Sequence, residues 1–84
     1  MRRALQDWYD LASRANWRSI DDVRSVFPSA DGVTVKSRKT VTVFNIRGNK
    51  YRLITAIHYN HSQVFIMRFL THREYDRDSW KDQL

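Results

Sequence analysis

The chain has 84 residues, which is enough for one compact domain over residues 1–84 and too few for a second. Fifteen Lys and Arg against nine Asp and Glu give a formal net charge of +6, which predicts attraction to polyanions. The absence of cysteine excludes disulfides and thiolate chemistry. With no apolar run long enough to cross a bilayer and no apolar signal segment, we expect a cytoplasmic protein without a membrane anchor.

Two helices are predicted in the first third of the chain. Apolar side chains recur at helical spacing over residues 3–16, namely at Leu5, Trp8, Leu11, Ala12 and Ala15. A second, shorter helix follows Ser19, which is a suitable N-cap with two acids behind it, and stops before Pro28. Residues 29–32 then form a predicted turn.

The rest of the chain alternates with period two and is rich in Val, Ile, Thr, Tyr and Phe, which indicates strands. We place strands at residues 33–36, 40–47, 50–59 and 63–71, joined by a tight turn at Gly48-Asn49 and another at residues 60–62. The tail is expected to form a short helix anchored by Tyr75 and Trp80. The predicted fold class is α+β, with two N-terminal helices packed on one face of a three- to four-stranded antiparallel sheet.

The turns decide which side chains share a face of this sheet. Across Gly48-Asn49, Ile46 faces Tyr51 and Phe44 faces Leu53, which makes one face apolar and suited to receive the helices. The last strand is expected to add Phe65, Met67 and Phe69 to that core, which is a stronger interpretation than a base-stacking platform.

The opposite face brings cationic side chains together if the second turn has three residues. Tyr59 then pairs with Gln63, Arg52 faces Leu70 and Arg68 faces Ile54. In that register Arg52 lies diagonally beside both Arg68 and His72. A turn of two residues would separate them, because a slip of one residue flips the faces of a strand.

This cluster fits the internal transesterification of RNA, in which the ribose 2′-OH is the nucleophile and the protein supplies charge and proton transfer. Arg52 and Arg68 are candidates for holding the phosphate, and His72 is a candidate acid or base near neutral pH. Tyr75 could stack on a base or donate its phenol. The alternatives are a surface role for the arginines, a capping role for His72 and a core role for Tyr75.

No acidic residue occurs from Gly32 to Arg73, which indicates phosphate contact because a carboxylate there would repel RNA. The candidate RNA-binding residues are Lys36, Arg38, Lys39, Arg47, Asn49, Lys50 and Arg73, although Asn49 is also a favoured turn residue. His58 and His61 are close in sequence, but without nearby carboxylates or cysteine they predict no metal site, and no cofactor motif is present.

Three segments together resemble the HigB-type toxins of the RelE-like superfamily: Val26-Phe27-Pro28-Ser29, residues 43–53 (VFNIRGNKYRL) and Thr71-His72-Arg73-Glu74-Tyr75-Asp76. The resemblance implies a RelE-like fold, ribosome-dependent cleavage of messenger RNA without a metal, and neutralisation by a helix-turn-helix antitoxin called HigA, with which higher-order assemblies form. Active-site groups of such toxins fall on the segments that carry Arg52, Arg68, His72 and Tyr75. Family members usually start with a short strand and a longer first helix, and this chain begins inside that helix, so either its start is trimmed or its sheet lacks the N-terminal strand.

Two other hypotheses from different functional classes remain. The basic face could bind RNA or the ribosome without cutting, in which case growth would stop while messages stay intact. Alternatively, the positive charge could serve mainly to receive an acidic antitoxin segment, which predicts RNA binding that is absent or insensitive to salt.

Overall fold

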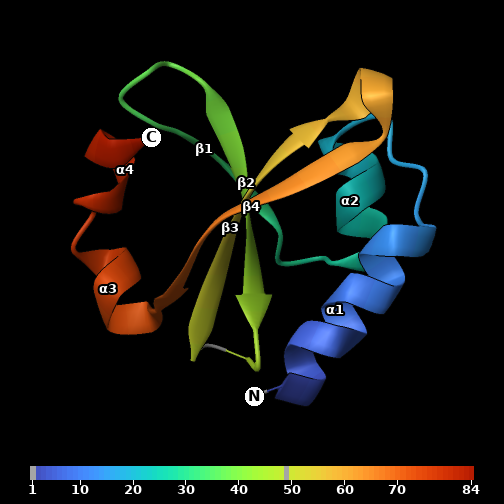
Figure 1. Ribbon diagram of the computed structural model, residues 1–84, viewed down its shortest axis with the longest axis horizontal. Helices are drawn as coiled ribbons and strands as arrows, with labels where there is room; N and C mark the ends of the chain where they lie inside the picture. The colour runs from blue at the N-terminus through green and yellow to red at the C-terminus, as the bar shows by residue number, and fades with distance from the viewer. Residues whose placement is uncertain (1, 49) are drawn as a thin grey trace.

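The computed structural model describes residues 2–48 and 50–84, which form three layers (Figure 1). The middle layer is an antiparallel sheet of four strands in the order β1-β2-β3-β4, comprising β1 (Asp31–Thr34), β2 (Thr40–Ile46), β3 (Tyr51–His58) and β4 (Gln63–Thr71). Helices α1 (Arg2–Arg14) and α2 (Ile20–Val26) lie on one side, and the short helices α3 (His72–Asp76) and α4 (Trp80–Gln83) lie on the other. The predicted α+β class is confirmed, with two helices N-terminal to the sheet.

The two N-terminal helices pack on the sheet face that the sequence predicts. Trp8, Trp17 and Val23 are buried from the helical side, and they meet Phe44 and Leu53 of the sheet. The Trp8 ring meets the Phe44 ring edge to face at a centroid distance of 5.4 Å. The predicted pairings of Ile46 with Tyr51 and of Phe44 with Leu53 are also present, so the first turn sets the register as expected.

The tail builds a second core on the other face of the sheet. Trp80 is 3% exposed and packs with Val41, Val43 and Ile54. The tail forms two short helices where the sequence predicts one, because Asp78 between them adopts a positive φ of 61°, which no α-helix continues through. In the described part of the chain, every helix falls short of the length and hydrophobicity that a membrane-spanning segment requires.

The first strand starts and ends two residues earlier than predicted. Gly32 pairs with Thr42 inside β1, although the sequence places it in a turn. The strand ends at Thr34 because the Val35 N–H donates to the Lys39 carbonyl at 2.9 Å, which closes the loop to β2. Val35 is buried in the second core and does not continue the strand.

The connection between β3 and β4 differs from the prediction by one residue. Gln63 pairs with His58 and not with Tyr59, because a 3₁₀ turn at Tyr59–His61 and a left-handed Ser62 (φ 52°) make the connection longer. A register shift between Ile54 and Thr55 absorbs the extra residue. Beyond it, Arg68 faces Ile54 as predicted.

This shift moves β4 side chains out of the predicted core. Val64 packs against the core of α1 and α2, whereas Phe65 faces Ala56 on the opposite side of the sheet. The prediction that Phe65, Met67 and Phe69 are core residues is wrong, since they are 48%, 37% and 36% exposed. Val64 and Leu70 of β4 are partly covered by the two cores, while most other β4 side chains stay exposed.

Truncation of Trp8 tests the main core. We expect Trp8→Ala to lower the free energy of unfolding by about 3–5 kcal/mol, because a large buried side chain leaves a cavity. Leu11→Ala on the same helix is the matched control, since Leu11 is 50% exposed and its truncation should cost under about 0.5 kcal/mol. Urea unfolding followed by circular dichroism measures both, and equal losses would contradict the assignment.

Candidate active site

Arg52 and Arg68 lie on the same side of the sheet. Arg52 of β3 faces Leu70, and Arg68 of β4 faces Ile54, two positions away along the same pair of strands. Both partners belong to the core formed with α4, so the two arginines point to the side of α3 and α4. They are the diagonal neighbours that the sequence predicts.

Arg52 is held in place by its surroundings. Only 9% of the residue is exposed, its Nη1 donates to the Tyr51 carbonyl at 3.2 Å, and its Cζ lies 5.6 Å from the centroid of the Tyr75 ring. A guanidinium in this position interacts favourably with the aromatic ring, by about 1 kcal/mol. Arg52 is therefore a fixed, largely buried charge beside Tyr75.

Tyr75 is stacked on Trp80, with ring centroids 5.3 Å apart and planes at 21°, and the Trp80 Nε1 donates to the Tyr75 carbonyl at 3.0 Å. Burial raises the pKa of the Tyr75 phenol above its ordinary value of 10.0. The phenol is thus protonated at neutral pH, where it can donate a hydrogen bond or a proton but cannot act as a base.

His72 opens α3 directly after its cap. The Thr71 Oγ1 accepts from the Glu74 N–H at 3.2 Å, and the Glu74 Oε1 accepts from the Thr71 N–H at 3.0 Å, which is a complete capping box. The His72 side chain is 50% exposed, and its Nε2 lies 3.5 Å from the Asp76 Oδ2. Its backbone N–H donates to the Lys50 carbonyl at 3.0 Å, which ties α3 to the β2–β3 turn.

A cavity of about 190 Å³ opens beside Arg68, lined also by Leu70, Glu74, Arg77, Ser79, Trp80 and Gln83. Its lining includes one arginine of β4, Arg68, and one arginine of the tail, Arg77. Arg77 is absent from the residues singled out in the sequence. The Thr71-x-x-Glu74 spacing would have predicted a helix start there and placed Arg77 one turn after Arg73, since residues four apart share a helical face.

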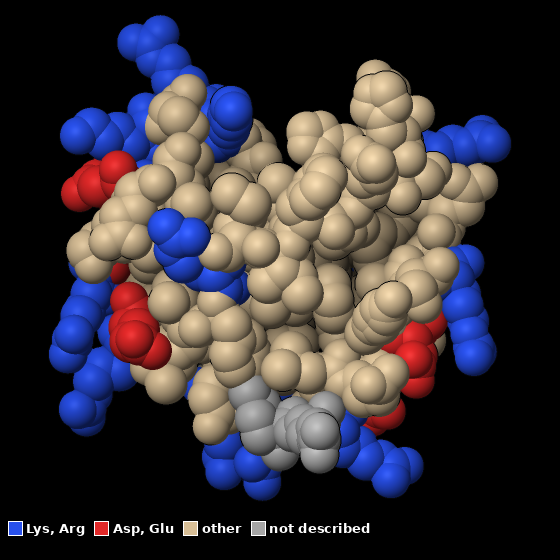
Figure 2. Space-filling view, in the orientation of Figure 1, with Lys and Arg blue, Asp and Glu red and all other residues tan. Residues whose placement is uncertain are grey.

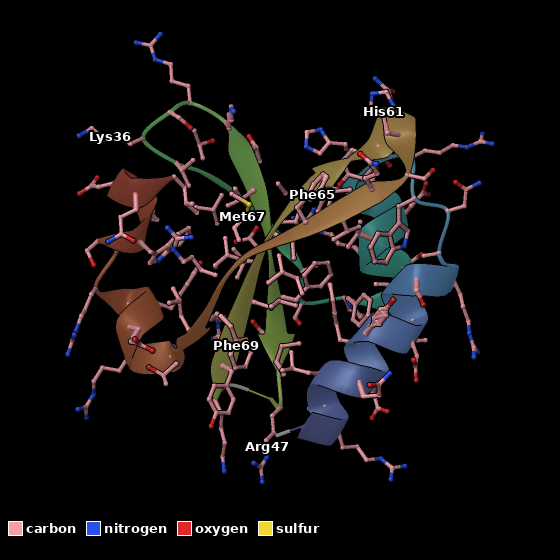
Figure 3. All side chains as sticks on the ribbon, viewed as in Figure 1. Lys36, Arg47, His61, Phe65, Met67 and Phe69 are labelled. Atoms are coloured by element: carbon pink, nitrogen blue, oxygen red, sulfur yellow. The ribbon has the colours of Figure 1, made fainter. Side chains whose placement is uncertain are left out.

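The candidate RNA-binding cations form two groups at opposite ends of β2. Lys36, Arg38 and Lys39 lie in the loop before β2, whereas Arg47 and Lys50 lie in the turn after it. Figure 3 shows Lys36 and Arg47 far apart across the molecule. Arg73 lies on α3, and Asn49 lies outside the described residues. The acid-free stretch is therefore one block in sequence but two groups in space.

The remaining two histidines lie at the end of β3 and in the 3₁₀ turn that follows it. His58 meets Phe65 edge to face, with ring centroids 5.4 Å apart, and His61 is exposed in the 3₁₀ turn. Within residues 2–48 and 50–84, no three His, Asp or Glu side chains are grouped so that they could hold a metal ion.

The capping box gives a pH-dependent contribution to stability. Hydrogen bonds from Thr71, the backbone N–H first, lower the pKa of Glu74 below its ordinary value of 4.5. A lowered folded-state pKa stabilises the protein above the ordinary pKa, and this contribution disappears as the pH falls through the folded value. We expect Glu74→Gln to lower the melting temperature at about pH 7 and to have little effect near about pH 3. A difference that stays constant between these pH values would contradict the assignment.

Comparison with known proteins identifies the family of the chain. The family described as HigB toxin, the RelE-like toxic component of a toxin-antitoxin system, matches residues 1–78. The mRNA interferase toxin HigB of Escherichia coli (strain K12) is 27% identical over 64 residues, which are 76% of this chain and 60% of that protein. The mRNA interferases HigB of Escherichia coli O157:H7 and Shigella flexneri match at the same identity and coverage, so the chain spans about 60% of the length of these relatives. The chain therefore belongs to the HigB toxin family of RelE-like toxins.

Proposed function

We propose that this chain is the toxin of a type II toxin-antitoxin system and cuts translated messenger RNA at the ribosome without a metal. The observation that carries the proposal is the side of the sheet that holds Arg68, His72, Tyr75 and the cavity shared by Arg68 and Arg77. Family membership supports the same function, since the relatives are named mRNA interferases.

Cleavage in this site begins when the ribose 2′-OH attacks the neighbouring phosphorus and the 5′-oxygen of the next nucleotide leaves. Arg68 and Arg77 both line the cavity and are suited to hold the phosphate and to stabilise the additional negative charge of the transition state. The one carboxylate in the lining, Glu74, accepts from the Thr71 N–H, and the two arginines offset its charge. Arg52 is too buried for a bidentate phosphate contact. Its guanidinium instead positions the Tyr75 ring and adds positive charge near the site.

Proton transfer is divided between His72 and Tyr75. Tyr75 keeps its proton at neutral pH, because burial raises the pKa of its phenol, and it can therefore donate to the phosphate or to the leaving oxygen. The His72 side chain is 50% exposed and can therefore reach RNA, and an imidazole is a common general base, so we assign it the 2′-OH proton. Asp76 holds the imidazole on the helix surface.

The RNA strand runs along the side of α3 and α4. The turn with Arg47 and Lys50 lies next to His72, as the bond from the His72 N–H to the Lys50 carbonyl requires. The loop with Lys36 lies next to α4, since the Lys36 N–H donates to the Lys81 carbonyl at 3.1 Å. The two basic groups thus flank the cavity, and Arg73 adds a charge on α3.

The proposed partners are messenger RNA, the ribosome and a helix-turn-helix antitoxin similar to HigA. An adjacent reading frame for a small helix-turn-helix protein that co-purifies with this chain would identify the antitoxin. The net charge of +6 favours both the RNA and an acidic segment of such a partner.

Variants of the site residues test catalysis. We expect His72→Ala to lower the rate of message cleavage by about 100- to 10,000-fold, since that is the usual contribution of a general acid or base. The Arg68→Ala, His72→Ala double variant should lose cleavage at least as completely. Primer extension on a translated message measures the cut sites, and Arg14→Ala on the exposed surface of α1 is the control expected to cut normally.

Two outcomes would contradict the proposal. Unchanged cutting by the double variant would remove the roles assigned to Arg68 and His72. Growth arrest by the unaltered chain with every message intact would favour a binder that acts without cleavage. Circular dichroism of each variant distinguishes lost chemistry from lost folding.

The salt dependence of RNA binding tests the path of the strand. Each phosphate contact with a single strand adds about 0.7 to the slope of log affinity against log salt. The Arg47→Ala, Lys50→Ala pair should therefore reduce the magnitude of this slope by about 1.4. The matched pair Arg14→Ala, Arg18→Ala removes two exposed arginines from the α1/α2 side and should leave it unchanged. Equal reductions by both pairs would indicate attraction to the overall charge and no defined path.

A further inference from the structure

A second cavity, of about 470 Å³, lies on the side of the sheet that carries α1 and α2. Its floor is formed by β1, β2 and the end of β3, and its rim by α2 and the residues just before it. Figure 1 shows α3 and α4 on the other side of the sheet, so the cavity is separate from the candidate active site. Its lining comes from residues 18–59, and its volume is within the range of about 300–1,000 Å³ that is usual for small-molecule sites.

The floor of this cavity contains a buried hydroxyl group without a partner. Thr42 is 5% exposed and lies on the same face of β2 as Phe44, which belongs to the core under α1 and α2. The Thr42 backbone carbonyl accepts from the Thr55 Oγ1 at 2.9 Å, whereas no residue of the described chain forms a hydrogen bond with the Thr42 hydroxyl. Buried hydroxyls are usually hydrogen-bonded, so this group is available to a ligand.

Gly32 keeps the floor open beside Thr42, with which it pairs across β1 and β2. It does not have a positive φ, and a Cβ at this position would meet only the Thr40 Cγ2, at an ordinary contact distance of 3.4 Å. Neither backbone conformation nor crowding therefore requires glycine, although glycine weakens the interior of a strand. Glycine in a strand often marks the close approach of a ligand, and a larger side chain here would enter the cavity.

The rim of the cavity is positively charged, and no carboxylate lines it. The Arg24 Nε donates to the Ala30 carbonyl at 3.0 Å, and the Arg24 Nη2 lies 3.4 Å from the Asp31 Oδ1, so this guanidinium is held and partly neutralised. Arg18 is exposed and can therefore turn its guanidinium to an anion. Charge alone does not distinguish the cavity, because Lys and Arg project around the whole rim of the molecule in Figure 2. The distinction is the combination of a cation with a buried hydroxyl.

One wall of the cavity is apolar and includes an aromatic ring. Ile20, Ile57 and Tyr59 supply this wall, and all three are half-buried at the edge of the core under α1 and α2. Among the described residues Tyr59 pairs with no other ring, whereas Tyr51 and Tyr75 each stack on an aromatic partner. The Tyr59 ring is therefore suited to stack on a planar group of a ligand.

We propose that this cavity binds a free mononucleotide, with its phosphate at Arg18, its base against Tyr59 and a polar edge of the base at the Thr42 hydroxyl. Inorganic phosphate would leave the apolar wall uncovered, and an aliphatic carboxylate would leave the buried hydroxyl unpaired. A nucleotide carries an anion, a planar ring and a hydrogen-bonding edge in one molecule. The inference goes beyond the proposed function and does not rest on it, since the two sites lie on opposite sides of the sheet.

The test titrates the full, ¹⁵N-labelled chain with AMP, GMP, CMP and UMP in turn. We expect at least one of them to give saturable changes in the amide signals of Ser19, Gly32 and Thr42, with a dissociation constant below about 1 mM. Gly32→Val should weaken this binding at least about tenfold by filling the cavity, without loss of stability, because valine favours strands. Thr34→Val lies on the same strand but outside the lining, so this matched control should bind normally.

Two further variants assign the parts of the nucleotide. Arg18→Ala should weaken the nucleotide about tenfold and leave the corresponding nucleoside unaffected, because only the nucleotide carries phosphate. Thr42→Val should weaken the nucleoside and the nucleotide equally, by about fivefold, and should fold normally because no hydrogen bond within the described chain is lost. Since the ligand is a free nucleotide, Arg18→Ala should not alter the salt dependence of RNA binding.

Four results would overturn the proposal, and all can be obtained on the unaltered chain. They are unchanged signals of the three amides with every nucleotide, changes confined to β4 and α3, equally tight binding of inorganic phosphate, and tighter binding of a single-stranded RNA at the same amides. The second result would place the nucleotide in the candidate active site. The third would reduce the cavity to an anion site, and the fourth would make it part of the path of an RNA strand.

Discussion

In an antiparallel sheet, a change of pairing by one residue turns every side chain of a strand to the opposite face. β3 and β4 use two registers, one from His58–Gln63 to Thr55–Ile66 and another from Ile54–Arg68 onwards. If the first register continued, Arg68 would face Leu53 and point to α1 and α2. The register shift therefore keeps Arg52 and Arg68 on one side, and the candidate site depends on it.

The tail converts that side of the sheet into a site. α3 has only five residues, which is too short for a helix to be stable by itself, so its position depends on packing and on its capping box. Trp80 supplies the packing, since it is buried against the sheet and stacked on Tyr75. Arg52 approaches the same ring from β3. These contacts fix Tyr75 relative to the sheet, and α3 carries His72 with it.

The two cores leave β4 less covered than β2 and β3. α1 and α2 bury Phe44 and Leu53, while α4 buries Val43 and Ile54, all of which belong to β2 and β3. Arg68 belongs to this less covered strand and also lines the cavity beside the tail. The candidate site is therefore open on the β4 side of the sheet.

Local patterns in the sequence were enough to predict much of the fold. The alternation of apolar residues gave two helices and four strands, and the Gly48-Asn49 turn predicted the pairing of Phe44 with Leu53, because such turns fix the register of a hairpin. The relation between Arg52 and Arg68 was also predicted, although through a three-residue turn that the protein does not have. The register shift compensated for that difference.

By itself, then, the sequence determined the α+β class, the apolar face for α1 and α2 and the choice of Arg52 and Arg68 as neighbours, since each depends on spacing within a strand or across one short turn. Only the tertiary structure decided that Phe65 is exposed and that Arg77 joins Arg68 at a cavity. The first feature depends on a bulge between β3 and β4, and the second depends on the packing of the tail against the sheet. Both follow from contacts between segments distant in sequence, which periodicity cannot specify.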